Sequence, residues 1–105
     1  MFTKDVEGLV GFLRLVFGAQ GEMHTAVPCE MQIGDSIIMV SDGGGVRDAW
    51  PAFLYVYVAD ADAVYRRALE AGATTIEEPA DTPYGHRRAT VQDRWNNVWQ
   101  IASAP

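Results

Sequence analysis

The chain has 105 residues, a formal net charge of −6 and a single cysteine. This length predicts one domain, and a lone cysteine excludes both an intramolecular disulfide and a zinc site built from several cysteines. Because the chain is acidic, has no apolar run near the ~20 residues that span a bilayer and begins without a signal-peptide pattern, we expect a cytoplasmic protein with no nucleic-acid or membrane partner.

The first predicted element is a helix over residues 6–17. Asp5 stands at its N-cap position, where a carboxylate accepts free amide hydrogens, and Gly18 stands where a left-handed C-terminal cap is expected. Apolar residues at helical spacing form one stripe along it, namely Val6, Leu9, Val10, Leu13, Val16 and Phe17.

A hairpin and a glycine-rich linker follow the helix. Strands over Cys29–Ile33 and Ser36–Ser41 flank Gly34-Asp35, a favourable two-residue turn, while residues 21–27 give a weaker strand prediction. Residues 42–49 include three successive glycines, which lose the most backbone entropy on folding, so we expect a linker there.

The second half predicts a strand, a helix and three more strands. Ala52–Val58 is rich in aromatic and β-branched residues, and Asp60 caps a helix over Ala61–Ala71. A loop is expected over Pro79–Gly85. The remaining strands are predicted over Ala73–Glu77, Arg87–Gln92 and Asn97–Ala102.

The two halves of the chain resemble each other. Asp5 and Asp60 each cap a helix of similar length that a glycine ends, and strands follow each helix. Two copies of strand–helix–three strands, over residues 1–42 and 50–105, therefore predict an α+β domain, because one copy alone could not bury its sheet face. Chance similarity between two capped helices is the alternative.

The first copy has little chain for its first strand. Only Met1–Thr3 precede the helix cap, whereas the counterpart Ala52–Val58 has seven residues. A strand this short leaves the neighbouring strand as an exposed sheet edge, which can pair with another chain. We expect either a homodimer partner that supplies the missing strand or a sheet that stays open on that side.

This order of elements resembles the glyoxalase/bleomycin-resistance/extradiol-dioxygenase superfamily, also called the vicinal oxygen chelate proteins. The resemblance implies two βαβββ modules that form a cupped mixed sheet around a small-molecule cavity, with helices outside and here a shortened first strand. It also implies a homodimer. The segments that carry it span nearly the whole chain: residues 4–19, 33–39, 57–64, 71–73, 84–87 and 93–99.

The resemblance implies four metal-ligand positions on the sheet, and the matching residues do not suit a metal. The first position falls at or before Met1, and the others fall on Ile38, Phe53 and Gln100. Ile and Phe cannot coordinate a cation, and Gln is a weak neutral ligand where Glu is usual. We therefore expect no metal and no cofactor, and we favour a protein that is not an enzyme.

Four further residues could take part in chemistry. His24 and His86 are the only histidines and could restore a metal site, or they could be partly exposed surface residues. Cys29 has no histidine near it in sequence and is expected to be a small buried residue rather than a nucleophile. Arg87 matches an arginine of similar proteins, and it either holds its loop by hydrogen-bonding carbonyls or pairs with an anionic ligand.

Strand alternation assigns the side chains of the second half to two faces. If Phe53 faces the cavity, Tyr55 and Tyr57 do so as well. If Gln100 faces it, Trp99 and Ile101 pack under the helices.

The repeat extends this assignment to the first half. Ser36, Ile38 and Val40 are then expected to face the cavity, and Ile37 and Met39 to face the helices. Trp50 and Trp95 lie at loop edges and could close over a ligand. The expected ligand-binding residues are Phe53, Tyr55, Tyr57, Gln100, Ser36, Ile38, Trp50 and Trp95.

An aromatic cavity without a metal-ligand set favours a metal-free protein that binds an aromatic or hydrophobic small molecule by stacking. Three alternatives stay open. The protein could be a metal-dependent lyase, isomerase or dioxygenase with an atypical ligand set. It could be a structural dimer module without a ligand, or its aromatic side chains could simply fill the cavity.

Overall fold

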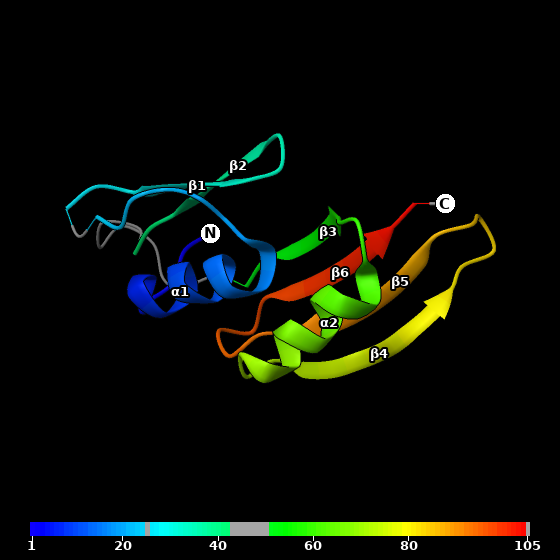
Figure 1. Cartoon of the computed structure of the whole chain (residues 1–105). Helices are drawn as coiled ribbons and strands as arrows, with labels where there is room; N and C mark the ends of the chain where they lie inside the picture. The colour runs from blue at the N-terminus through cyan, green and yellow to red at the C-terminus, as the bar shows by residue number, and fades with distance from the viewer. Residues whose placement is uncertain (25, 43–50, 105) are drawn as a thin grey trace. The chain divides into compact units, whose positions relative to one another are not determined.

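The computed structural model describes residues 1–24, 26–42 and 51–104 (Figure 1). The chain divides into two compact units, Met1–Pro51 and Ala52–Pro105, called here the N-terminal and C-terminal units. Trp50 and residues 43–49 of the expected linker lie outside the described residues.

The N-terminal unit is built on the helix α1, Val6–Phe17, which begins and ends as predicted. A side-chain oxygen of Asp5 accepts a hydrogen bond from the Gly8 amide at 3.0 Å, and Gly18 adopts a left-handed φ of 65° at the C-cap. The apolar stripe is buried, as expected for an amphipathic helix. Its buried residues are Leu9, Val10, Phe12, Leu13 and Val16.

Strands β1, Cys29–Ile33, and β2, Ser36–Val40, form the predicted antiparallel hairpin of this unit. The weaker strand prediction over residues 21–27 is wrong for its described residues, 21–24, 26 and 27, none of which lies in a strand. An isolated bridge joins the neighbouring Gln20 to Gln32, and a second bridge joins Phe2 to Ser41 in parallel.

The expected face assignment of β2 is wrong. Val40 is fully buried, whereas Ile37 and Met39 are 64% and 49% exposed. The register explains the reversal, because Val40 pairs with buried Cys29 and Ile38 pairs with buried Met31. Partners across a ladder share a face, so the side of β2 that bears Val40 is the core side of the unit, which also contacts α1.

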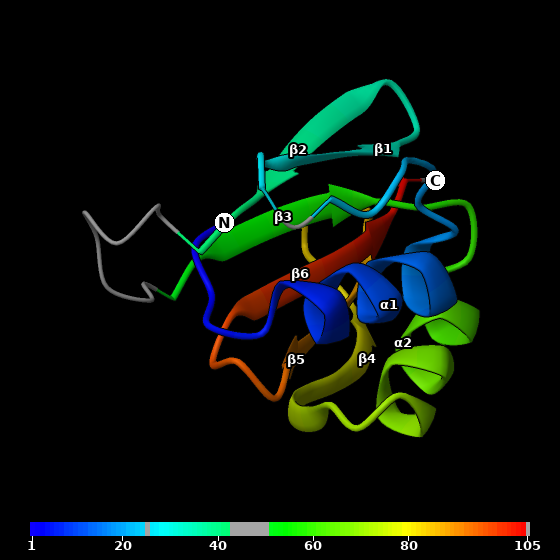
Figure 2. The same ribbon diagram turned by 90° about the vertical axis from the view of Figure 1, so that its left-hand side faces the viewer.

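The C-terminal unit is a four-stranded sheet in the order β3-β6-β5-β4, with the helix α2 on one face (Figures 1 and 2). Only the pairing of β3 with β6 is parallel. The elements are β3 Phe53–Tyr57, α2 Ala61–Glu70, β4 Thr74–Asp81, β5 Arg87–Gln92 and β6 Val98–Ser103.

Strand β4 is longer than predicted and absorbs part of the expected loop. Pro79 lies within it, although proline cannot donate a ladder hydrogen bond. The position tolerates proline because β4 is an edge strand and its register shifts between Glu77 and Ala80.

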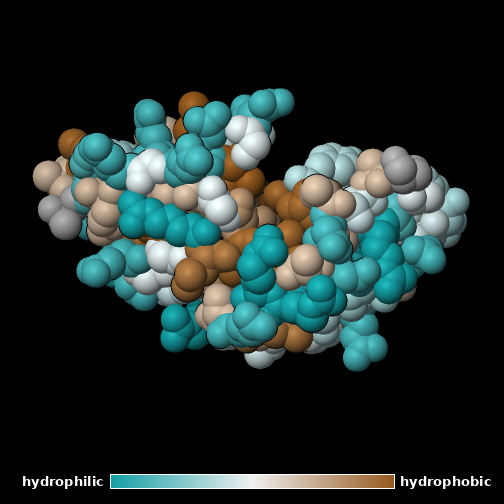
Figure 3. All heavy atoms as spheres, in the orientation of Figure 1, coloured by the Kyte–Doolittle hydropathy of each residue, from teal (hydrophilic) through white to brown (hydrophobic). Residues whose placement is uncertain are grey.

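Large apolar side chains fill the space between this sheet and α2. Trp99 and Ile101 are fully buried and pair across the ladder with Val91 and Ala89. These partners confirm the expected helix-side face of β6. Hydrophilic side chains prevail over α2 in Figure 3, in keeping with its exposed Arg66 and Glu70.

The turn between β5 and β6 is organised by the buried carboxylate of Asp93, which is 4% exposed. It accepts hydrogen bonds from the Trp95 amide at 2.9 Å, from the amide and side chain of Asn97, and from the indole Nε1 of Trp99 at 2.8 Å. The side-chain oxygen of Asn97 in turn accepts the Ala52 amide at 2.9 Å, next to the start of β3. One carboxylate thus links the turn, the core tryptophan and the neighbouring strand.

Replacing Asp93 with Ala should lower the free energy of unfolding by about 3 kcal/mol, because buried donors on Asn97 and Trp99 would lose an ionised acceptor. Urea unfolding followed by tryptophan fluorescence measures the loss. Asp93→Asn should cost less, since one acceptor oxygen stays, and Glu70→Ala on exposed helix surface is the control. An Asp93→Ala protein as stable as that control would contradict this account.

Candidate functional site

Aromatic side chains gather on the face of the C-terminal sheet that lies opposite α2. The Tyr55 hydroxyl is 2.9 Å from Nδ1 of His86. The rings of Tyr55 and Tyr57 are 5.3 Å apart, and the His86 ring meets those of Tyr57 and Tyr84 edge to face at 5.5 and 4.9 Å. We call Tyr55, Tyr57, Tyr84 and His86 the tyrosine–histidine cluster.

The register shows which strand residues share this face. Tyr55 pairs with Gln100 and Tyr57 with Ala102. Trp99 and Ile101, which alternate with these two residues along β6, are buried on the helix side. The expected grouping of Phe53, Tyr55, Tyr57 and Gln100 on one face is therefore confirmed, although their role in ligand binding is a separate question.

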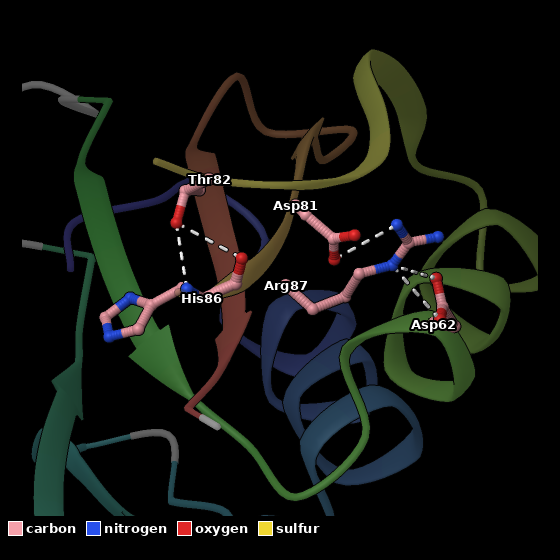
Figure 4. Close-up of polar contacts among 5 residues, drawn as sticks. All are labelled: Asp62, Asp81, Thr82, His86 and Arg87. Atoms are coloured by element: carbon pink, nitrogen blue, oxygen red, sulfur yellow. Dashed lines mark hydrogen bonds and ion pairs between the residues drawn. The ribbon is translucent and has the colours of Figure 1, made fainter. Parts of the chain in front are cut away.

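A tight turn between β4 and β5 positions His86. Thr82 Oγ1 accepts a hydrogen bond from the His86 amide at 2.9 Å and donates one to its carbonyl at 3.1 Å (Figure 4). The Thr82 amide also donates to that carbonyl at 2.8 Å. These hydrogen bonds fix both the amide and the carbonyl group of His86, and the His86 ring projects toward β3 (Figure 4).

Arg87 points the other way, toward α2 (Figure 4). Its guanidinium lies 3.4 Å from Asp62 and 3.5 Å from Asp81. The pKa of Arg87 is raised, chiefly by the hydrogen bond to Asp62. Arg87 therefore ties the start of β5 to α2 and to the end of β4 through carboxylates, and it is turned away from the tyrosine–histidine cluster.

Arg88 returns to the face of the cluster. Its Nη1 donates a hydrogen bond to the Tyr84 hydroxyl at 2.9 Å, and its Nη2 is 3.6 Å from Glu77 Oε1. The same Glu77 oxygen accepts a hydrogen bond from Thr90 at 2.5 Å, and Thr90 pairs with Gln100 across the ladder. A single cation, partly neutralised by one carboxylate, therefore adjoins the aromatic rings.

Two of the tyrosines have shifted acidity in opposite directions. Burial raises the pKa of Tyr55, and the hydrogen bond with Tyr84 raises it further. That same hydrogen bond lowers the pKa of Tyr84, and the positive charge of Arg88 lowers it as well. The surroundings of the Tyr84 oxygen therefore make this hydroxyl more acidic than an ordinary tyrosine.

The other expected site residues belong to other elements. Trp95 is in the β5–β6 turn, where the Arg94 guanidinium lies 5.4 Å from its ring centroid. Ser36 and Ile38 belong to β2 of the N-terminal unit, and Ile38 lies on its core side. Trp50 lies outside the described residues.

Sequence reasoning missed the polar part of this face. Tyr84, Arg88, Glu77 and Thr90 were not expected to contribute, and His86 was considered only as a metal ligand or a surface residue. Alternation from His86 through Arg88 to Thr90 is the signal that could have found them, once the register of β5 against Gln100 was known.

The donor set does not fit the metal that the superfamily resemblance implies. Ile38, Phe53 and Gln100 occupy the expected ligand positions, and the described part of the chain holds no group of three His, Cys, Asp or Glu side chains close enough for a metal ion. His24 is exposed. Cys29 is buried, and its sulfur contacts Met23 and the His24 carbonyl.

The N-terminal unit also contains a hollow of about 350 Å³ beside the start of α1. Charged side chains of both signs line it, including Lys4, Asp5 and Glu7. Sequence reasoning did not predict it, and it shares no residue with the tyrosine–histidine cluster.

Comparison with known proteins gives a family match and partial matches to individual proteins. The family model described as the Glyoxalase/Bleomycin resistance protein/Dioxygenase superfamily matches residues 1–101. The anthracycline biosynthesis protein DnrV of Streptomyces peucetius is 48% identical over 50 residues, which are 48% of this chain and 17% of that protein. The uncharacterized protein Mb0911c of Mycobacterium bovis is 34% identical over 68 residues, 65% of this chain and 41% of that protein. The matched segments thus span less than half the length of these relatives.

Solved structures share the fold at low sequence identity. TioX from Micromonospora sp. ML1 superposes with a TM-score of 0.82 at 23% identity, over 100% of this chain and 94% of that one. The fosfomycin resistance protein FosX of Mesorhizobium loti gives 0.72 at 19% identity, over 99% and 86%. These matches confirm the expected mixed α+β fold. Within the described residues, no helix is long and apolar enough to cross a membrane.

Alkaline titration of the tyrosines tests the electrostatics of the cluster. The first tyrosine to ionise should be Tyr84, at a pH below the ordinary pKa of about 10. In a titration followed by phenolate absorbance, this first ionisation is the early component of the curve. Tyr84→Phe should remove the early component, and Arg88→Met should move it to higher pH.

The control for this titration is Tyr65→Phe, which removes a phenol from α2 instead of the cluster. The early component should persist in it. If Tyr84→Phe kept the early component, the assignment to Tyr84 would be wrong.

Proposed function

Because the chain belongs to the glyoxalase/bleomycin resistance protein/dioxygenase superfamily, we propose that it binds an aromatic or hydrophobic small molecule without a metal ion. The observation that carries this proposal is the tyrosine–histidine cluster on one face of the C-terminal sheet, with Gln100 and Arg88 beside it. Flat rings supply stacking surface, and the polar side chains supply a few orienting hydrogen bonds.

Exposure of the aromatic side chains supports a binding role. Phe53 is 68% exposed, Tyr57 65% and Tyr84 57%. Phe53 and Tyr57 on β3 and Tyr84 in the β4–β5 turn thus expose large aromatic side chains, which is unusual for a surface without a partner. A ligand that covers them gains the free energy of removing this apolar area from water.

The names of related proteins agree with a role in handling small molecules. DnrV is named for anthracycline biosynthesis and FosX for fosfomycin resistance. We extend to this chain only the general idea that such a fold engages a small natural product or drug. Binding of this kind is stoichiometric and needs no acid, base or metal.

Ligand screening by thermal unfolding tests the proposal. Planar aromatic compounds should raise the melting temperature as their concentration exceeds Kd, by about 2.7 kcal/mol of added stability at 100 times Kd. Tyr57→Ser should weaken binding about 2- to 10-fold, the effect of losing one aromatic contact. Tyr65→Ser on α2 is the matched control.

Two results would overturn this proposal. One is the absence of any shift across a broad panel of planar compounds. The other is a stoichiometric metal found by elemental analysis of the purified protein, together with ligand binding that a chelator abolishes. That second result would favour a metalloenzyme with an atypical ligand set.

We further propose that the two units form one domain and that the protein is a cytoplasmic homodimer, as the superfamily resemblance implies. Strand β3 supports the dimer, since it is an edge of the C-terminal sheet and pairs with β6 on one side only in that sheet. Sedimentation equilibrium should give twice the 11.5 kDa of the chain. A monomer at all accessible concentrations would contradict the dimer.

A further inference from the structure

We propose that the ligand of this site is an acidic phenol, an aromatic ring whose hydroxyl ionises near neutral pH, and that it binds as the phenolate with its charged oxygen at Arg88. This inference rests on the proposed function, because it names the class of molecule that the tyrosine–histidine cluster takes. It is carried by the arrangement of Arg88, Tyr84, Tyr55 and His86.

The structure already places a phenol oxygen at Arg88. The Tyr84 hydroxyl accepts a hydrogen bond from Arg88 Nη1 at 2.9 Å, while the ring of Tyr84 lies edge to face with His86. A hydroxyl-bearing aromatic ring bound at this point could make the same two contacts. Tyr84 therefore shows the pose that a phenolic ligand would adopt.

Tyr84 itself can give way to such a ligand. It lies in the β4–β5 turn and is 57% exposed, so moving its side chain costs little burial. The turn also has hydrogen bonds that do not involve Tyr84, since Thr82 holds the backbone of His86 through three of them. The Tyr84 side chain can thus leave while the frame of the site stays.

The charges around this position suit a singly charged oxygen. Arg88 Nη1 donates a hydrogen bond to the Tyr84 oxygen at 2.9 Å, and the hydrogen bonds from Tyr55 and Arg88 lower the pKa of Tyr84, so an ionised oxygen is easier to hold at this position than in water. Arg88 is the cation that faces it, and Glu77 offsets part of that charge from 3.6 Å. A phosphate or another dianion would find too little positive charge here, and a neutral ring would leave Arg88 unused.

The remaining groups on this face support the same class of ligand. Tyr55 presents a hydroxyl that can donate to an oxyanion, and His86 Nδ1 holds that hydroxyl at 2.9 Å. Tyr57 adds a flat ring 5.3 Å from Tyr55. Aromatic rings thus adjoin the charge-binding position, so a phenolate fits better than an aliphatic carboxylate.

A matched pair of probes tests this inference. The ligand 7-hydroxycoumarin absorbs at different wavelengths when neutral and when ionised, whereas 7-methoxycoumarin has the same shape and cannot ionise. The wild-type protein should bind the ionised hydroxycoumarin about tenfold more tightly than the methoxy compound. The bound probe should also show the spectrum of the phenolate at a pH where the free probe is mostly neutral.

Variants of the charged groups separate a direct role from a structural one. Arg88→Met should weaken binding of the ionised probe about tenfold and leave the methoxy compound unchanged, while Arg88→Lys should restore part of the loss. Glu77→Gln should strengthen phenolate binding several-fold, because it frees the charge of Arg88. Arg66→Met on α2 is the matched control.

The outcomes distinguish this inference from the proposed function. If both probes bind equally and Arg88→Met affects neither, the phenolate inference is wrong while binding of planar molecules stands. If neither probe binds, the inference falls and the proposed function loses its support. If the Arg88→Met protein does not fold, Glu77→Gln still tests the inference. Weaker binding of the ionised probe by Glu77→Gln would overturn it.

Discussion

The buried carboxylate of Asp93 is the interaction on which the C-terminal unit depends. It accepts hydrogen bonds from the β5–β6 turn and from the indole of Trp99. Asn97, one of these donors, in turn accepts a hydrogen bond from the Ala52 amide beside β3. An ionised group at this depth is stable only when its acceptor positions are filled, and here four donors fill them. Because the turn joins β5 to β6 and contacts the residue before β3, the carboxylate stabilises the register in which these strands pair.

Along β5, that register places residues with a structural role on one face of the sheet and residues of the candidate site on the other. Arg87 binds two carboxylates and ties β5 to α2, whereas its neighbours His86 and Arg88 point to the opposite face. Alternation along a strand forces this division, since successive side chains leave on opposite sides. The same sequence motif, Tyr84 to Arg88, therefore supplies both a structural brace and the polar half of the proposed site.

The proposed site differs in kind from a metal centre. Its donors are phenol hydroxyls, one imidazole and one guanidinium, which orient an aromatic ligand and stabilise an oxyanion but do not assemble a cation site. The Glu77 carboxylate lies 3.6 Å from Arg88 and accepts a hydrogen bond from Thr90. The chemistry proposed for this arrangement is recognition of an acidic aromatic group, with charge balance set by Arg88 and Glu77.

The sequence by itself determined the elements and the family. Helix caps at Asp5 and Asp60, the Gly34 turn and the apolar alternation of β6 are local signals, because capping, turn geometry and strand period depend on a few neighbouring residues. Only the tertiary structure decided the rest. Which face of β2 is buried depends on its pairing with β1, and the approach of Tyr84, His86 and Arg88 to Tyr55 depends on how β4 and β5 are registered against β6. These are contacts between residues far apart in sequence, where a shift of one residue in register would move every side chain to the other face.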